Sequence, residues 1–239
     1  MKAIVLKFGG SVLKGPENFS GIAEKISDFK KKFERVVVVV SAMGEMTKEL
    51  LDLAFEVSKC PPKREQDMLL SVGERISMAL LAMALKERGI DAISFTGSQA
   101  GIITCGEHTE AQILRVRPLR VVKHLDAGRV VIVAGFQGVS EAGEITTLGE
   151  SGSDLTAVAL GDALGAEEVV FFKDVGGIFD RDPKRDLKAR LQKLLSYKAA
   201  LEFCEKGNIL QPKAVKYAQD KGVRLVICSM EKNIQSVVT

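Results

Sequence analysis

Short runs of consecutive hydrophobic residues alternate along the chain with stretches in which hydrophobic residues recur every three or four positions. The first run covers residues 3–6 and leads into Lys7-Phe8-Gly9-Gly10-Ser11. Residues 17–33 then carry Phe and Ile at helical spacing, and residues 36–40 are five consecutive valines. Short apolar runs are typical of buried parallel strands, and the wider spacing predicts an amphipathic helix. The order therefore predicts a strand, helix, strand unit.

The same alternation continues to the end of the chain. A long helix is predicted from about residue 64 to 88, where Gly89 stops it. Residues 102–118 are ambiguous and resemble short strands, and residues 141–149 form a hairpin or a loop. The further predicted strands cover residues 92–95, 130–134, 168–172 and 223–228, and the further helices follow Thr47 and cover residues 119–125, 155–164, 196–206 and 212–221. The pattern indicates an α/β protein of one large domain or two closely joined lobes.

Small and polar residues follow several of the predicted strands. In open α/β sheets ligands collect at the carboxyl ends of the strands. The Gly9-Gly10 turn is such a place: glycines with positive φ would expose backbone N–H groups to an anion, and Lys7 would add a positive charge. An ordinary strand turn with a surface lysine explains the same residues, so both interpretations stay open.

Two further positions allow a structural and a functional interpretation. Ser151-Gly152-Ser153-Asp154 precedes a predicted helix, where Ser or Asp would cap the helix or the N-terminus would bind a second anion. Glu74 stands among leucines, valine and isoleucine of the long predicted helix. Its carboxylate lies either on a solvated face or against a specific partner.

Composition narrows the possible function classes. The 239 residues carry a net charge of +3, few aromatics and no Trp, which argues against a nucleic-acid or membrane surface. Four widely spaced cysteines and two histidines match no zinc or disulfide pattern, so we expect no metal site built from side chains. The apolar start is too short for a signal peptide, and no run approaches a membrane span. We expect a cytoplasmic protein.

Eight segments, in order, carry a family resemblance. They are K-F-G-G-S, V-V-V-S-A-M-G, S-V-G-E-R-I-S, G-S-Q-A-G-I-I-T, V-A-G-F-Q-G, G-S-D-L-T-A-V-A-L, D-V-x-G-I-F-x-x-D-P and P-K-A-V. Together they span almost the whole chain, which resembles the catalytic domain of the aspartokinases in the amino acid kinase superfamily. The resemblance implies a three-layer αβα sandwich with a mostly parallel central sheet. It also agrees with the absence of a P-loop sequence.

The resemblance also implies a domain organisation. Residues 1–239 would form one amino acid kinase domain, with an acceptor-binding lobe over about 1–145 and a nucleotide-binding lobe over about 146–239. Aspartokinases usually continue into ligand-binding ACT regulatory domains, for which we expect no room here. Feedback inhibition by lysine or threonine through this chain alone is therefore not expected.

Site residues follow from the resemblance by position. Lys7 and Asp154 would be the catalytic pair, with Asp154 orienting Lys7. The transferring phosphate would lie against Lys7, Gly9, Gly10 and Ser11. The acceptor amino acid would be held by Ser41, Thr47, Glu74 and Ser153, with Glu74 facing its ammonium group. The nucleotide would be surrounded by Lys173, Asp174, Phe179, Asp182 and Lys184.

The implied reaction is ATP-dependent phosphorylation of the side-chain carboxylate of L-aspartate to 4-phospho-L-aspartate. This is the first step of aspartate-family amino acid biosynthesis, which includes lysine. The implied cofactors are ATP and Mg²⁺, with the metal held by ATP rather than by side chains. A homodimer is expected by analogy with the family.

Three positions depart from the aspartokinase pattern. Glu150 stands where the family has an arginine for the α-carboxylate of the substrate, Gly176 interrupts T-D-V-D-G, and Asn208 replaces the lysine of K-V-L-H-P. Lys173 would restore the lost charge near ATP. Two alternatives follow: an amino acid kinase with a different carboxylate or related acceptor, and a nucleotide-binding pseudokinase that serves as a regulatory subunit.

Overall fold

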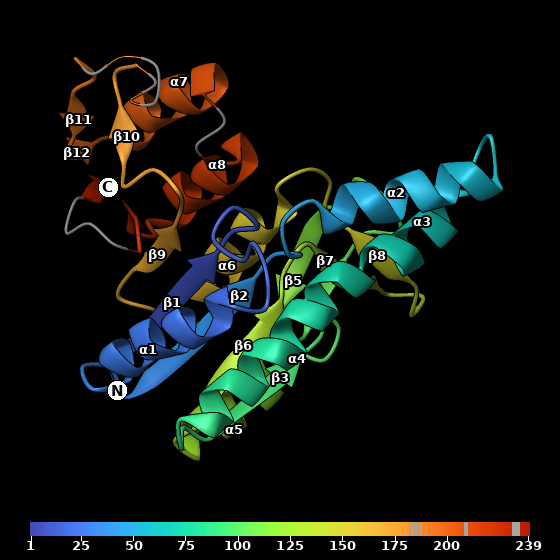
Figure 1. The fold of residues 1–239 in the computed structure, drawn as a ribbon, viewed down its shortest axis with the longest axis horizontal. Helices are drawn as coiled ribbons and strands as arrows, with labels where there is room; N and C mark the ends of the chain where they lie inside the picture. The colour runs from blue at the N-terminus through green and yellow to red at the C-terminus, as the bar shows by residue number, and fades with distance from the viewer. Residues whose placement is uncertain (182, 184–185, 187, 208–209, 231–234) are drawn as a thin grey trace.

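An eight-stranded sheet forms the centre of the computed structural model, which describes residues 1–181, 183, 186, 188–207, 210–230 and 235–239 (Figure 1). The strand order is β12-β14-β13-β9-β1-β2-β6-β3, and all neighbours are parallel except β13 and β14. The strands are β1 (Ala3–Phe8), β2 (Arg35–Val40), β3 (Ala92–Phe95), β6 (Val130–Ala134), β9 (Val169–Phe172), β12 (Leu194–Leu195), β13 (Leu225–Cys228) and β14 (Gln235–Val238).

Helices cover both faces of this sheet and bury two separate cores. On one face α1 (Asn18–Lys30) and α4 (Val72–Glu87) pack on the side chains of Ile4 and Leu6. On the other face α5 (Leu119–Asp126), α6 (Gly152–Leu164) and α8 (Pro212–Lys221) pack against the strands, where Val5 points. Side chains of a strand alternate between faces, so fully apolar strands are buried on both sides. The expected three-layer sandwich with a mostly parallel sheet is confirmed.

Two smaller units flank the large sheet (Figure 1). A four-stranded sheet of order β5-β4-β7-β8 lies with α2 (Met46–Val57) and α3 (Lys63–Leu70), and α3 packs against β8. Its strands are β4 (Ile102–Thr104), β5 (Ile113–Val116), β7 (Gln137–Ser140) and β8 (Ile145–Thr147). On the opposite side β10 (Ile178–Phe179) pairs with β11 (Leu191–Gln192) near α7 (Tyr197–Gly207).

Three elements differ from the sequence-based prediction. The predicted helix over 64–88 is two helices that meet at Ser71, whose carbonyl accepts a hydrogen bond from Gln137 Nε2. Gln137 begins the strand β7, which the sequence pattern did not predict and which forms because β4 and β8 pair with that segment. The final strand β14 was missed, and it runs antiparallel to β13. Each difference comes from a tertiary contact that local periodicity does not record.

No run of the sequence was expected to approach a membrane span, and the segment Lys63–Glu87 departs from this expectation. By length and composition alone it passes as one candidate span, with 39% of its most apolar window buried. A core helix passes the same test, and α4 packs on the sheet through Leu81 and Leu85. Its outer face still exposes Ile76 and Met83.

Two helical glycines give a matched test of how closely α6 approaches the sheet. A Cβ on Gly161 in α6 would lie 2.5 Å from Val169 Cγ2 of β9, whereas Gly21 in α1 has nothing within 4 Å. Gly161→Ala should lower the free energy of unfolding by about 1–3 kcal/mol through overpacking. Gly21→Ala should raise it by about 0.5–1 kcal/mol through helix propensity. Urea unfolding of both variants measures this, and equal shifts would contradict the packing described.

Candidate active site

A buried carboxylate shared by two lysines lies where three core elements meet. Lys7 Nζ, near the end of β1, is 2.6 Å from Asp154 Oδ1 in the first turn of α6. Lys173 Nζ, directly after β9, is 3.1 Å from Asp154 Oδ2. The Lys7 and Asp154 side chains are 5% and 1% exposed, and that of Lys173 is 18% exposed. β1 and β9 are adjacent parallel strands, so Lys7 and Lys173, which are far apart in the sequence, converge at the carboxyl ends of these two strands.

Burial and charge act in opposite directions on the groups of this cluster. Burial on its own would raise the pKa of Asp154, but the ammonium groups of Lys7 and Lys173 outweigh it and hold that pKa below its usual range. Burial, together with repulsion from Lys173, lowers the pKa of Lys7, and Asp154 offsets part of this effect. Two ammonium groups facing one carboxylate leave an excess positive charge, which an anion would neutralise.

The glycine turn after β1 packs closely on the loop after β2. A Cβ on Gly10 would lie 3.0 Å from Ala42 O and 3.3 Å from Gly44 O. A Cβ on Gly9 would lie 3.5 Å from Lys7 Nζ, so a side chain there would fill the space beside the ammonium. Neither glycine has positive φ, which corrects the sequence-based reason for their presence. The glycines are needed for close approach, and this approach leaves Ser11 exposed at the surface.

Glu74 belongs to the same region. Of the two interpretations left open for it, a solvated face is wrong because the side chain is buried. It lies in the first turn of α4, is 3% exposed and accepts a hydrogen bond of 3.1 Å from the Ala42 N–H. Its second oxygen, Oε2, has no hydrogen-bond partner within the described residues. Burial raises the pKa of Glu74 to about 7, although the Ala42 N–H and Lys7 act in the opposite direction. A buried oxygen without a partner and a carboxyl near neutrality are what a cationic ligand would stabilise.

The start of α6 is shaped by close packing rather than by capping. Ser151 has a left-handed φ of 56°, and no side chain caps the helix. Ser153 lies against Gly135 of the loop after β6, where a Cβ would come within 2.8 Å of its Oγ. Asp154 instead turns to the lysines and accepts a 3.3 Å hydrogen bond from the Gln211 N–H. Gln211 Nε2 also donates to the Glu150 carbonyl at 2.7 Å.

The remaining expected site residues lie around this centre. Ser41 follows β2 directly, and Thr47 lies in the first turn of α2; both are half-buried. Asp174 is exposed two positions after the end of β9, and Phe179 is half-buried in β10. Asp182, Lys184 and Asn208 lie outside the described residues. Gln211 was not identified as a site residue from the sequence, because its contact with Asp154 spans 57 positions.

The donor set fits a phosphate-containing ligand. Lys7 and Lys173 supply cations, and the N–H groups of Gly10 and Ser11 donate to no other described residue. Among described residues no group of three or more His, Cys, Asp and Glu side chains could hold a metal ion.

Comparison with known proteins identifies the family to which the chain belongs. The model of the amino acid kinase family matches residues 2–229. The chain belongs to this family. The aspartokinase of Bacillus sp. (strain MGA3) is 47% identical over 240 residues, covering 100% of the chain and 58% of the relative. The aspartokinase of Geobacillus stearothermophilus is 48% identical over 234 residues, covering 98% of the chain and 58% of the relative.

Solved structures of this family show the same fold. The aspartate kinase from Synechocystis superimposes with a TM-score of 0.87 at 40% identity, covering 99% of the chain and 40% of its own length. E. coli aspartokinase III in complex with aspartate and ADP has a TM-score of 0.89 at 23% identity, covering 99% of the chain and 64% of its own length. The chain thus spans little more than half the length of the curated relatives it matches.

The raised pKa of Glu74 predicts a pH-dependent penalty on folding. The folded state favours the protonated carboxyl. The stability that this preference adds is fully present below pH 4.5, the ordinary pKa of the group, and is lost as the pH rises through about 7, where the penalty appears. Glu74→Gln mimics the protonated form. Its free energy of unfolding relative to the native chain should rise by up to about 3 kcal/mol between pH 4.5 and pH 8. Urea unfolding at both pH values measures this, and a difference independent of pH would contradict the burial of an ionisable Glu74.

Proposed function

We propose that the chain transfers the γ-phosphoryl group of Mg²⁺-bound ATP to the side-chain carboxylate of L-aspartate, giving 4-phospho-L-aspartate and ADP. The observation that carries the proposal is the buried Lys7–Asp154–Lys173 cluster beside the glycine turn. The identity to aspartokinases over the whole chain supports the choice of acceptor. The proposal concerns the part of those relatives that the chain spans.

The chemistry needs position and charge more than a base. A carboxylate oxygen of the acceptor attacks the γ-phosphorus, and the bond from phosphorus to the β,γ-bridging oxygen breaks. The bridging oxygen keeps the electron pair and leaves as ADP, so no proton is transferred at the reacting atoms. The negative charge spread over the transferring group requires cations and in-line alignment. Mg²⁺ would neutralise part of this negative charge on the phosphates.

Each residue of the site has a role in this proposal. Lys7 and the N–H groups of Gly10 and Ser11 contact the transferring phosphoryl group, and Asp154 keeps Lys7 charged and oriented. Glu74 binds the ammonium of the acceptor through its unpaired Oε2, with Ser41, Thr47 and Ser153 around the same molecule. The nucleotide lies over the ends of β9 and β10, against Lys173, Asp174 and Phe179, and the proposal also assigns it Asp182 and Lys184, which lie outside the described residues. Residues of about 1–145 thus form the acceptor lobe and those of about 146–239 the nucleotide lobe.

One observation favours a second candidate function. Glu150 occupies the position of the arginine that aspartokinases direct at the α-carboxylate of the substrate. Arg115 and Arg117 are the two cations that would replace it, and Arg115 is engaged with Glu141 at 2.6 Å. A carboxylate in place of a cation at about 4 Å would turn roughly 4 kcal/mol of attraction into a similar repulsion. An acceptor without a free α-carboxylate removes this conflict, so a related amino acid or carrier-bound acid is the alternative.

The remaining parts of the proposal follow from the family. The protein acts as a homodimer in the cytoplasm, in the biosynthesis of lysine and related amino acids. A nucleotide-binding pseudokinase is the outcome to be tested against it, because Gly176 and Asn208 also depart from the aspartokinase pattern.

Release of ADP from Mg²⁺-bound ATP tests the proposal directly. The assay compares reactions with and without aspartate, and hydroxylamine traps any acyl phosphate as a hydroxamate. We expect ADP and hydroxamate to form together and only with aspartate. A panel of carboxylates and of aspartate derivatives blocked at the α-carboxylate serves as the comparison.

The two alternatives give different results in the same assay. Turnover with a blocked derivative but not with aspartate would assign the second candidate function. Binding of ATP with no turnover on any acceptor would contradict a kinase and support the pseudokinase.

A further inference from the structure

A second buried carboxylate, Asp67 in α3, has no part in the site described above. It is fully buried and accepts hydrogen bonds from the Thr109 N–H at 3.1 Å and from the Thr147 hydroxyl. His108 Nδ1 lies 2.7 Å from its second oxygen. These donors belong to the loop between β4 and β5 and to the end of β8. Asp67 therefore joins α3 to two segments that lie 41 to 80 positions away in the chain.

The loop that Asp67 holds reaches the entrance of α6. Thr109 has a positive φ of 72°, a strained conformation for a threonine that surrounding contacts must maintain. The next residue, Glu110, lies so close to Gly149 that a Cβ there would be 2.6 Å from its carboxylate oxygens. Glu110 also pairs with Lys213 of α8 at 2.9 Å. The loop thus lies between α3 and the segment that begins α6.

The segment that begins α6 is itself held in an unusual backbone conformation. The described chain has three non-glycine residues with positive φ: Thr109, Phe136 and Ser151. All three lie in or beside the segment that begins α6. Phe136 belongs to this group because it packs on Gly152 and its carbonyl accepts a hydrogen bond from the Leu148 N–H. Strained residues gather where a structure fixes a functional geometry. Ser153 and Asp154 follow within three positions of Ser151.

We propose that Asp67 is a positioning residue for phosphoryl transfer: it locks the 108–110 loop, which in turn holds residues 148–151 so that Ser153 and Asp154 face the acceptor and Lys7. The inference rests on the proposed function. Asp67 touches neither substrate nor the reacting atoms in this account. Its effect is exerted through Thr109, Glu110 and Gly149, and a misplacement of about 1 Å at a reacting group can cost 100-fold in rate.

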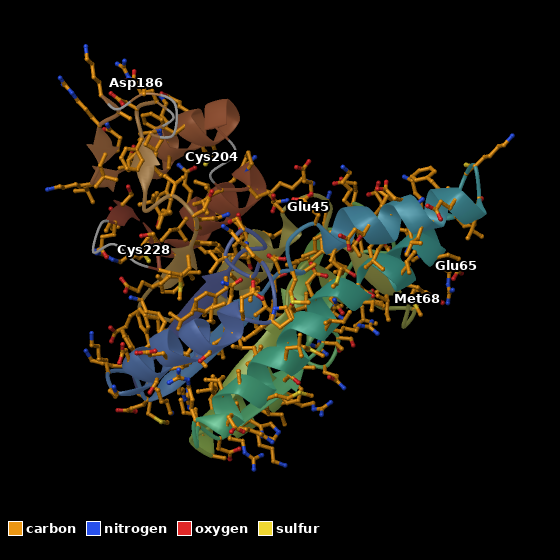
Figure 2. All side chains as sticks on the ribbon, in the orientation of Figure 1. Glu45, Glu65, Met68, Asp186, Cys204 and Cys228 are labelled. Atoms are coloured by element: carbon orange, nitrogen blue, oxygen red, sulfur yellow. The ribbon has the colours of Figure 1, made fainter. Side chains whose placement is uncertain are left out.

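Three variants separate positioning from simple stability. Asp67→Ala leaves the Thr109 N–H and the Thr147 hydroxyl without their buried acceptor. Asp67→Asn keeps an oxygen for both donors and is the conservative variant. Glu65→Gln is the matched control, because Glu65 lies on the same helix with a side chain 60% exposed on the outer side (Figure 2).

Hydrogen exchange of the full chain measures how firmly Asp67 holds the 108–110 loop and residues 148–151, and it does not require activity. We expect Asp67→Ala to speed amide exchange at least tenfold both in peptides covering 105–112 and in peptides covering 148–154. Peptides from α1 and β9 should exchange as in the native chain, and Glu65→Gln should change none of these. Faster exchange confined to 105–112, or no change at all, would overturn the proposed link to α6.

Steady-state kinetics then test how this restraint on the loop affects acceptor binding and turnover. Asp67→Ala should raise KM for the acceptor at least tenfold and lower kcat, while the affinity for Mg²⁺-bound ADP stays within twofold. Asp67→Asn should remain within threefold of the native KM. A variant that is only partly folded would lower kcat alone, so an unchanged KM would overturn the inference. If the native chain shows no turnover, the proposed function fails, and the exchange experiment still decides whether Asp67 fixes the start of α6.

Discussion

The attraction between Lys7, Lys173 and the buried Asp154 is the interaction on which the site depends. Removing one partner of a buried ion pair costs about 3–5 kcal/mol, because the other charge is left without compensation. The three groups come from β1, the segment after β9 and the start of α6, so their contact fixes two adjacent strands and a helix in one arrangement. The same contact leaves an excess positive charge at the carboxyl end of the sheet. Stability and the capacity to bind an anion therefore have the same origin.

The surrounding packing explains why small residues recur at this end of the sheet. Gly10 approaches the loop that follows β2, and Gly135 approaches Ser153. Side chains at either position would push apart the segments that carry the polar groups. Glu74 completes the arrangement from the opposite helix layer, with one oxygen bound to Ala42 and the other unpaired. An anion beside the lysines and a cation beside Glu74 is the charge pattern of a nucleotide phosphate next to an amino acid.

The sequence predicts the layers of this fold well because strands buried on both faces and amphipathic helices have distinct periodicities. It predicts less where tertiary contacts decide: the break at Ser71 depends on Gln137, and β7 depends on its neighbours. At the site, the family resemblance brought Lys7 and Asp154 forward, while composition alone left Glu74 undecided. Asp67 and Gln211 escaped notice because a buried side chain is informative only once its distant partners are known.

The turnover of Asp154→Asn tests the central claim most directly. Asp162→Asn in the same helix is the control, because the Asp162 carboxylate lies toward the far end of α6 and accepts a hydrogen bond from the Tyr217 hydroxyl. The account predicts that Asp154→Asn loses at least 100-fold in kcat while Mg²⁺-bound ADP still binds, because Lys7 is no longer kept charged and oriented. Asp162→Asn should keep native kcat. A native kcat in Asp154→Asn would contradict the account and show that the buried cluster serves the fold alone.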